Sequence, residues 1–241
     1  MSRVFAAYSV GGLIGPALGI FGGIHGPFLA YLGLLLLAVP LVLFVAEPVT
    51  RRDFTADRGA LRTRGFWAAC AAILFAVLAL GVLEGVLPLH FAERLSQAQI
   101  GALYVGASIV VAASGGMSGG RQPRPLVFAA VLLAVAGISL AGMAASIPLW
   151  VVALLLAGVG IGLANTGSLG LLVEAVPVER IVTAMVVWSQ IGIIGYLLGP
   201  LAGGLLAEGP GYAFVGLAPA AAAVVVLALT RSGRSRAAGP I

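Results

Sequence analysis

The pattern of the segment GGLIGPALG at residues 11–19 recurs in GYLLGPLAG at residues 195–203, and this repeat sets the register of the predicted membrane spans. Both copies read G-x-x-x-G-P-x-x-G inside an apolar run, and their Gly-Pro steps stand 184 residues apart. A glycine spacing of four on a lipid-buried helix makes a smooth face for close helix packing. A proline there removes one backbone donor and favours a kink. The predicted helix-packing residues are Gly11, Gly15, Pro16 and Gly19 in the first copy and Gly195, Gly199, Pro200 and Gly203 in the second.

The composition indicates an integral membrane protein. The chain is 61% hydrophobic and only 9% charged, whereas a soluble domain carries about 25% charged residues. Its single cysteine, Cys70, excludes an internal disulfide framework and a cysteine-rich metal site. We therefore expect no metal and no cofactor.

Eight apolar runs are long enough to cross a bilayer, which takes about 20 residues. They read as helices, because unpaired backbone is too costly in lipid, and they lack the alternating polar residues of barrel strands. The predicted spans cover about residues 4–22, 27–46, 66–90, 99–118, 126–145, 149–172, 182–206 and 212–230.

The arginines predict the orientation. If the N-terminus is cytoplasmic, eight spans place twelve arginines inside and leave Arg94 alone outside, as the positive-inside rule predicts. Both termini are then cytoplasmic. A secretory signal peptide is the alternative for the first run, but the pattern of that run recurs in the seventh, where no signal could be.

The repeat spacing predicts internal symmetry. The two Gly-Pro copies lie six spans apart, so the chain contains one complete six-span repeat preceded by the last two spans of another. Parallel six-span repeats describe the major facilitator superfamily of transporters, and the Gly-Pro pattern resembles the antiporter motif of that family's fifth span. The resemblance assigns the chain to the family's spans five to twelve, with about four N-terminal spans missing.

Two further segments agree with this resemblance. Residues 116–124, GMSGGRQPR, stand where the family carries a G-x-x-x-D-R-x-G-type loop motif, with Gly120 in place of the aspartate. Residues 81–89, GVLEGVLPL, resemble the L-E-P-x-L-P segment of vesicular amine transporters and related drug:proton antiporters, with Gly85 in place of the first proline.

The resulting organisation is an all-α membrane protein of four parts. We predict the last two spans of an N-terminal half at residues 1–46 and a cytoplasmic linker at 47–65. A complete C-terminal half follows at 66–230, with a cytoplasmic tail at 231–241.

Glu84 is the predicted proton-coupling and substrate-binding residue. A carboxylate inside a span is costly and usually faces a bundle interior or a water-filled cavity, and removal from water favours its neutral form. A proton-coupled exporter needs a group that either a proton or a cationic substrate can neutralise. The structural alternative is that Glu84 reaches the outer surface or pairs with Arg94.

Other polar side chains inside spans are candidates for the wall of a substrate cavity. Hydrogen bonding between helices is the alternative role. These candidates are Tyr8, Tyr104, Asn165, Gln190 and Tyr196.

Different classes of protein fit the sequence less well. The G-x-S-G pattern ending at Gly119 matches intramembrane serine proteases, but that chemistry needs a histidine beside Ser118. His25 and His90 are both predicted at the opposite face of the membrane. A channel would need a ring of charges or a filter segment, and a chain without lysine has no phosphate-binding P-loop.

We therefore expect a secondary transporter of the cell membrane that exports cationic or amphipathic small molecules in exchange for protons. Its expected partners are the lipid bilayer, the substrate and protons, with no nucleic acid and no defined protein partner. The alternatives are transport of another small solute, such as a sugar, an amino acid or a metabolite, and a truncated fragment without transport of its own.

Overall fold

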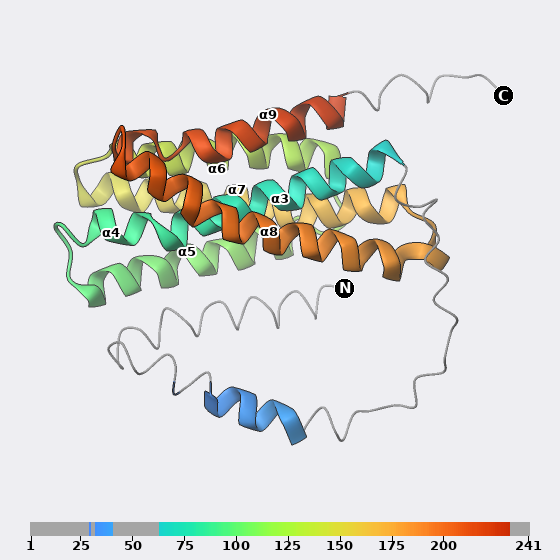
Figure 1. The fold of residues 1–241 in the computed structure, drawn as a ribbon, viewed down its shortest axis with the longest axis horizontal. Coiled ribbons are helices and arrows are strands. Elements are labelled where there is room, and N and C mark those ends of the chain that lie inside the picture. Colours follow the sequence, from blue (N-terminus) through green and yellow to red (C-terminus); the bar gives the residue numbers. More distant parts are fainter. Residues whose placement is uncertain (1–28, 30–31, 41–62, 232–241) are drawn as a thin grey trace.

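The structure is a computed structural model that describes Leu29, residues 32–40 and residues 63–231. Residues 63–231 form a bundle of long helices (Figure 1). Six helical segments in the described residues are long and apolar enough to cross a membrane. The elements are α3 (Arg64–Gly85), α4 (Leu87–Phe91), α5 (Gln97–Met117), α6 (Pro123–Met143), α7 (Ile147–Ala175), η2 (Val178–Arg180), α8 (Ile181–Glu208), η3 (Tyr212–Phe214) and α9 (Leu217–Arg231).

The long helices alternate in direction, so the bundle has two ends. One end carries α4, the turn between α6 and α7, and η3; we call it the α4 end (Figure 1). The other carries η2 and the turn between α5 and α6, and we call it the η2 end. As a consequence α3 and α8 run in the same direction.

Local sequence sets where the helices begin. The Thr63 side chain accepts a hydrogen bond of 3.2 Å from the Phe66 amide at the start of α3. Ser96 and Gln99 form a reciprocal capping box at the start of α5. Pro123 occupies the first position of α6, where a missing amide hydrogen costs nothing.

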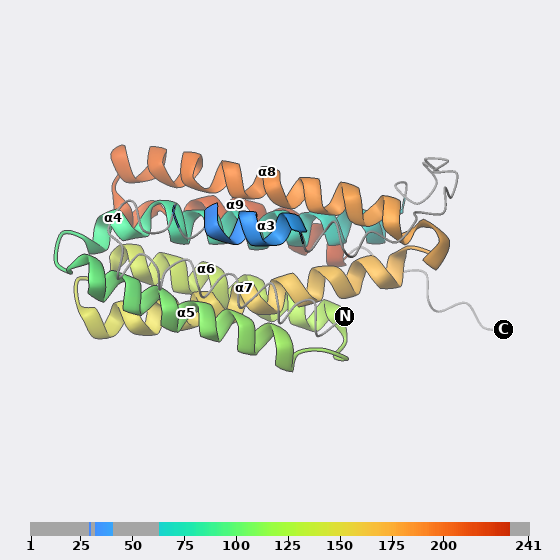
Figure 2. The same ribbon diagram turned by 90° about the horizontal axis from the view of Figure 1, so that it is seen from below.

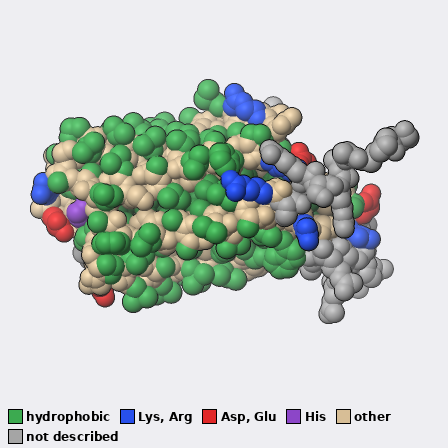
Figure 3. All heavy atoms as spheres, turned by 90° about the horizontal axis from the view of Figure 1, so that it is seen from above, with side chains coloured by type: hydrophobic (Ala, Val, Ile, Leu, Met, Phe, Trp, Pro, Cys, Tyr) green, Lys and Arg blue, Asp and Glu red, His purple; other side chains and the backbone are tan. Residues whose placement is uncertain are grey.

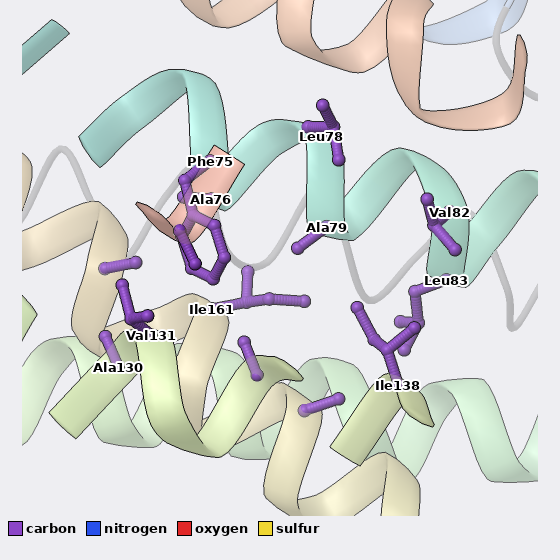
Figure 4. Close-up of a cluster of buried hydrophobic side chains, with 14 of the residues drawn as sticks. Phe75, Ala76, Leu78, Ala79, Val82, Leu83, Ala130, Val131, Ile138 and Ile161 are labelled. Atoms are coloured by element: carbon purple, nitrogen blue, oxygen red, sulfur yellow. The ribbon is translucent and has the colours of Figure 1, made fainter. Parts of the chain in front are cut away.

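The core lies between α3, α6 and α7. Figure 4 shows Phe75 of α3 beside Ile161 of α7, with Val131 and Ile138 of α6 facing the same space. All four side chains are at most 2% exposed. The helices α8 and α9 pack on α3, while α5 packs on α7 (Figure 2), so α3 and α7 form the centre of the bundle.

The outer surface of the bundle is apolar along its flank. Figure 3 shows hydrophobic side chains along the length of the bundle and charged ones gathered toward its ends. Leu197, Leu201 and Leu205 of α8 are each more than 60% exposed. An apolar surface of this extent is unsuited to water and suited to lipid.

Six of the predicted spans coincide with described helices to within a few residues. The predicted span 66–90 is interrupted at Val86, which separates α3 from α4. The predicted span 212–230 begins as the 3-10 turn η3, and its α-helix starts only at Leu217.

The N-terminal predictions fall largely outside the described residues. The span 4–22 lies there entirely, as do most of the linker 47–65 and the tail after Arg231. Of the span 27–46, residues 32–40 form a helix that stands apart from the bundle (Figure 1). The count of eight spans and the division into two halves therefore stay predictions.

Candidate functional site

The helix that carries Glu84 is broken directly after it. α3 ends at Gly85, and Val86 links it to the five-residue helix α4 with φ −118° and ψ −48°. Pro88 follows in the first turn of α4 and has no amide hydrogen to offer the Glu84 carbonyl one turn earlier. Glu84 therefore lies in the last turn of a helix that ends inside the apolar segment Arg64–Phe91.

The Glu84 carboxylate is hydrogen-bonded to a neighbouring helix. The Tyr196 hydroxyl of α8 donates to Glu84 Oε2 over 3.0 Å. Arg94, the alternative partner, donates instead to the Ala145 carbonyl over 2.5 Å. Within residues 63–231 no arginine or histidine forms an ion pair with Glu84, so a tyrosine is the observed partner of this acid.

Glycines bring α3 and α8 into close contact beside this pair. A Cβ atom on Gly195 would stand 2.6 Å from the Leu74 carbonyl oxygen, and one on Gly199 would stand 2.5 Å from that of Leu78. Gly203 lies against Val82 and Val86 one turn further on. The three glycines of the second Gly-Pro segment are buried and face α3 along a register that advances four residues at a time.

Pro200 lies at the centre of this crossing. Its ring packs against Gly81 and Gly85 of α3. Because Pro200 has no amide hydrogen, the Tyr196 carbonyl four residues earlier lacks its usual helical donor, and that oxygen faces Gly81. The residue that binds Glu84 thus stands one turn before a proline.

Tyr104 of α5 reaches the broken end of α3 from another side. Its side chain is 7% exposed, and its hydroxyl donates to the Leu83 carbonyl. Its ring lies 6.5 Å from that of Phe91 in α4. Tyr104 therefore contacts the chain on both sides of the break.

The remaining candidate cavity residues lie elsewhere. The Asn165 side chain donates to the Ile161 carbonyl of its own helix over 3.2 Å. Its neighbour Thr166 donates to the Gly115 carbonyl of α5 over 3.0 Å, which is the interhelical role. Gln190 is exposed on α8, and Tyr8 lies outside the described residues. Substrate contact by any of them stays a prediction.

Sequence reasoning missed an aromatic cluster at the α4 end. The His90 ring stacks on Tyr212 with centroids 4.5 Å apart and meets Trp150 edge-on at 5.6 Å. Trp150 is 1% exposed, and its indole N–H donates to the Ala144 carbonyl over 2.9 Å. The cluster joins α4, the start of α7 and η3, three segments far apart in sequence, so only their aromatic residues could have indicated it.

The protease alternative has no geometric support in the described residues. Ser118 is buried at the η2 end of α5, where its hydroxyl donates to the Gly115 carbonyl over 2.9 Å. His90 lies at the α4 end of the bundle. An open pocket of about 340 Å³ at the η2 end involves Arg121, Thr166 and Glu174 but neither Glu84 nor Tyr196. The described residues also contain no cluster of three side chains able to hold a metal ion.

The fold and the site together define a class of protein: a bundle of membrane-spanning helices with an acidic side chain inside one span, as secondary transporters have. Residues 119–240 match the model of the Major Facilitator Superfamily, and the chain belongs to this superfamily of transporters. The match includes α6 to α9, and thus Tyr196, but not the segment around Glu84. A search of curated proteins found no match.

Proposed function

We propose that this superfamily member is a proton-coupled exporter of cationic or amphipathic small molecules. The observation that carries the proposal is the Glu84–Tyr196 hydrogen bond between α3 and α8. Among the described residues Glu84 has no basic partner, and it belongs to a segment long and apolar enough to cross a membrane, which supports the proposal. Such acids in membrane spans are costly and commonly serve transport.

Transport of the substrate is coupled to protons because either partner can neutralise the charge of Glu84. A carboxylate in a low-dielectric region requires a counter-charge or a proton. Either a proton or a cationic substrate can neutralise Glu84, so binding of one favours release of the other. A hydroxyl donor such as Tyr196 stabilises the carboxylate with no positive charge of its own and leaves the acid free to exchange these partners.

The charges at the two ends support an orientation with both termini in the cytoplasm. Arg64, Arg121, Arg124, Arg180 and Arg231 lie at the η2 end. Arg94 is the one described arginine at the α4 end. The positive-inside rule then assigns the η2 end to the cytoplasm, so Glu84 stands toward the outer half of its span.

Alternating access supplies the mechanism. We take the described bundle as the C-terminal six-helix half, which rocks against a second half around a site between them. The crossing of α3 and α8 is well placed to transmit this motion, because it joins Glu84 to Tyr196 and has Pro200 at its centre.

Reconstitution into proteoliposomes tests the proposal. An imposed pH gradient should drive accumulation of a fluorescent amine by the wild-type protein, and Glu84→Gln should abolish it. Glu93→Gln is the matched control, because the Glu93 side chain is exposed at the α4 end and lies near His90. Full accumulation by Glu84→Gln would contradict the role of Glu84. Gradient-driven uptake of a sugar or an amino acid, but of no amine, would favour the alternative substrate class.

A further inference from the structure

We propose that Tyr104 is a positioning residue for Glu84, which it acts on by fixing the broken end of α3. This inference rests on the proposed function, in which Glu84 couples proton and substrate. In this role Tyr104 binds the backbone next to Glu84 and does not line the substrate cavity.

The break in α3 creates a need for such a residue. The last four carbonyl groups of a helix have no intrahelical donor and need another partner. α3 ends at Gly85, so the Leu83 and Glu84 carbonyls both belong to this last turn. Pro88 removes the donor that a continuous helix would supply to the Glu84 carbonyl. Without an external donor, the backbone that carries Glu84 would be held loosely.

Tyr104 supplies an external donor to this last turn from α5. Its hydroxyl binds the Leu83 carbonyl, the peptide group that leads directly into Glu84. Its ring also lies beside Phe91, which is fully buried after the break. A single side chain thus fixes the position of α3 relative to α4.

The two tyrosines bind different groups of the chain at Glu84. Tyr196 binds the carboxylate of Glu84 from α8, whereas Tyr104 binds the preceding carbonyl from α5. Tyr104 is buried and its one hydroxyl proton is already donated. It therefore has no donor left for a substrate, and its effect on transport passes through the position of Glu84.

Tyr104→Phe tests the assignment, because it keeps the ring beside Phe91 and removes only the hydroxyl. We expect kcat for gradient-driven uptake to fall by about tenfold, since small misplacements of a reacting group are costly, with KM for the amine unchanged. Tyr212→Phe is the matched control, since it removes a hydroxyl at the same end of the bundle away from Glu84. A rise in KM with kcat unchanged would overturn the inference and make Tyr104 a substrate contact.

A second variant tests whether the effect passes through the break. Pro88→Ala returns a backbone N–H one turn after Glu84, so it should restore helical continuity across Val86. In the double variant, we expect Pro88→Ala to recover most of the kcat that Tyr104→Phe loses. The two substitutions would then be coupled in a double-mutant cycle. Independent effects of the two substitutions would contradict positioning through the break.

A chemical readout separates this inference from the proposed function. Hydrophobic carbodiimides label protonated carboxyl groups, and mass spectrometry can follow labelling at Glu84 without any transport. We expect Tyr104→Phe to change the labelling rate at Glu84 by severalfold, and Tyr212→Phe to leave it unchanged. An unchanged rate in Tyr104→Phe would overturn the positioning role. If the rate changes while Glu84→Gln still accumulates amine, the positioning role holds and the proposed coupling role fails.

Discussion

The ring of Pro200 in α8 lies against Gly85 in α3, so closely that a Cβ atom on Gly85 would stand 2.8 Å from Pro200 Cγ. A side chain at that position would occupy the space of the Pro200 ring. The crossing of α3 and α8 therefore depends on a glycine next to the acidic residue.

We expect Gly85→Ala to destabilise the protein by about 1–3 kcal/mol, the usual cost of overpacking a close contact. The ring of Pro200 cannot rotate away as a flexible side chain would. The apparent melting temperature in detergent measures the effect. Gly106→Ala in α5 is the control, because nothing lies within 4 Å of a Cβ atom there. Equal melting temperatures for the two variants would show that α3 and α8 are less closely packed.

The second Gly-Pro segment allows a matched comparison within one helix. A Cβ atom on Gly199 would stand 2.5 Å from the Leu78 carbonyl oxygen, whereas one on Gly204 would meet nothing within 4 Å. We expect Gly199→Ala to lower the melting temperature and Gly204→Ala to leave it unchanged or raise it, because alanine favours helix over glycine by about 1 kcal/mol. The reverse order would contradict the packing role of this glycine face.

Trp150 should be the tryptophan on which stability depends. Its indole is buried and hydrogen-bonded to the Ala144 carbonyl, whereas Trp67 is 48% exposed. Truncation of a buried aromatic side chain costs about 3–5 kcal/mol, so Trp150→Ala should unfold far more readily than Trp67→Ala. Thermal unfolding followed by circular dichroism compares them. Similar losses in both variants would show that the cluster at the α4 end is not tightly packed.

His90 presents the opposite case, a polar side chain whose replacement should stabilise the fold. Both ring nitrogens are buried without a hydrogen-bond partner, and the Glu93 carboxylate is 3.8 Å from Nδ1. His90→Phe keeps the stacking on Tyr212 and removes the buried polar atoms, which should stabilise the protein by about 1 kcal/mol. The melting temperature checks this. A clear fall would mean that the imidazole gains a partner when the protein is in the membrane.

Hydropathy predicted the helices well because membrane spans are defined by apolar length. The bounds of α5, α6, α7 and α8 differ from the predicted ranges by a few residues. The break at Val86 was missed, although Pro88 indicates it, because an apolar run continues through it. The later start of α9 was missed for the same reason.

The sequence predicted the individual residues of the candidate site but not which of them contact one another. Glu84 and Tyr196 are each notable as polar residues inside apolar runs, yet they are 112 positions apart. Hydropathy does not say which helices are neighbours. The contact between them follows from the matching small residues of α3 and α8, such as Gly81 and Gly199, which become informative only once both helices are placed. Tyr104 likewise required the position of α5.

In the proposed mechanism a proton and a cationic substrate compete for Glu84, and the release of protons on substrate binding tests this competition. Titration calorimetry of the purified protein with an amine, in buffers of different ionisation enthalpy, measures the protons released per cation bound. Where Glu84 is protonated before binding, linkage predicts release of about one proton from the wild-type protein and from Glu93→Gln, and none from Glu84→Gln. Equal proton release from the wild-type protein and Glu84→Gln would show that the released proton does not come from Glu84.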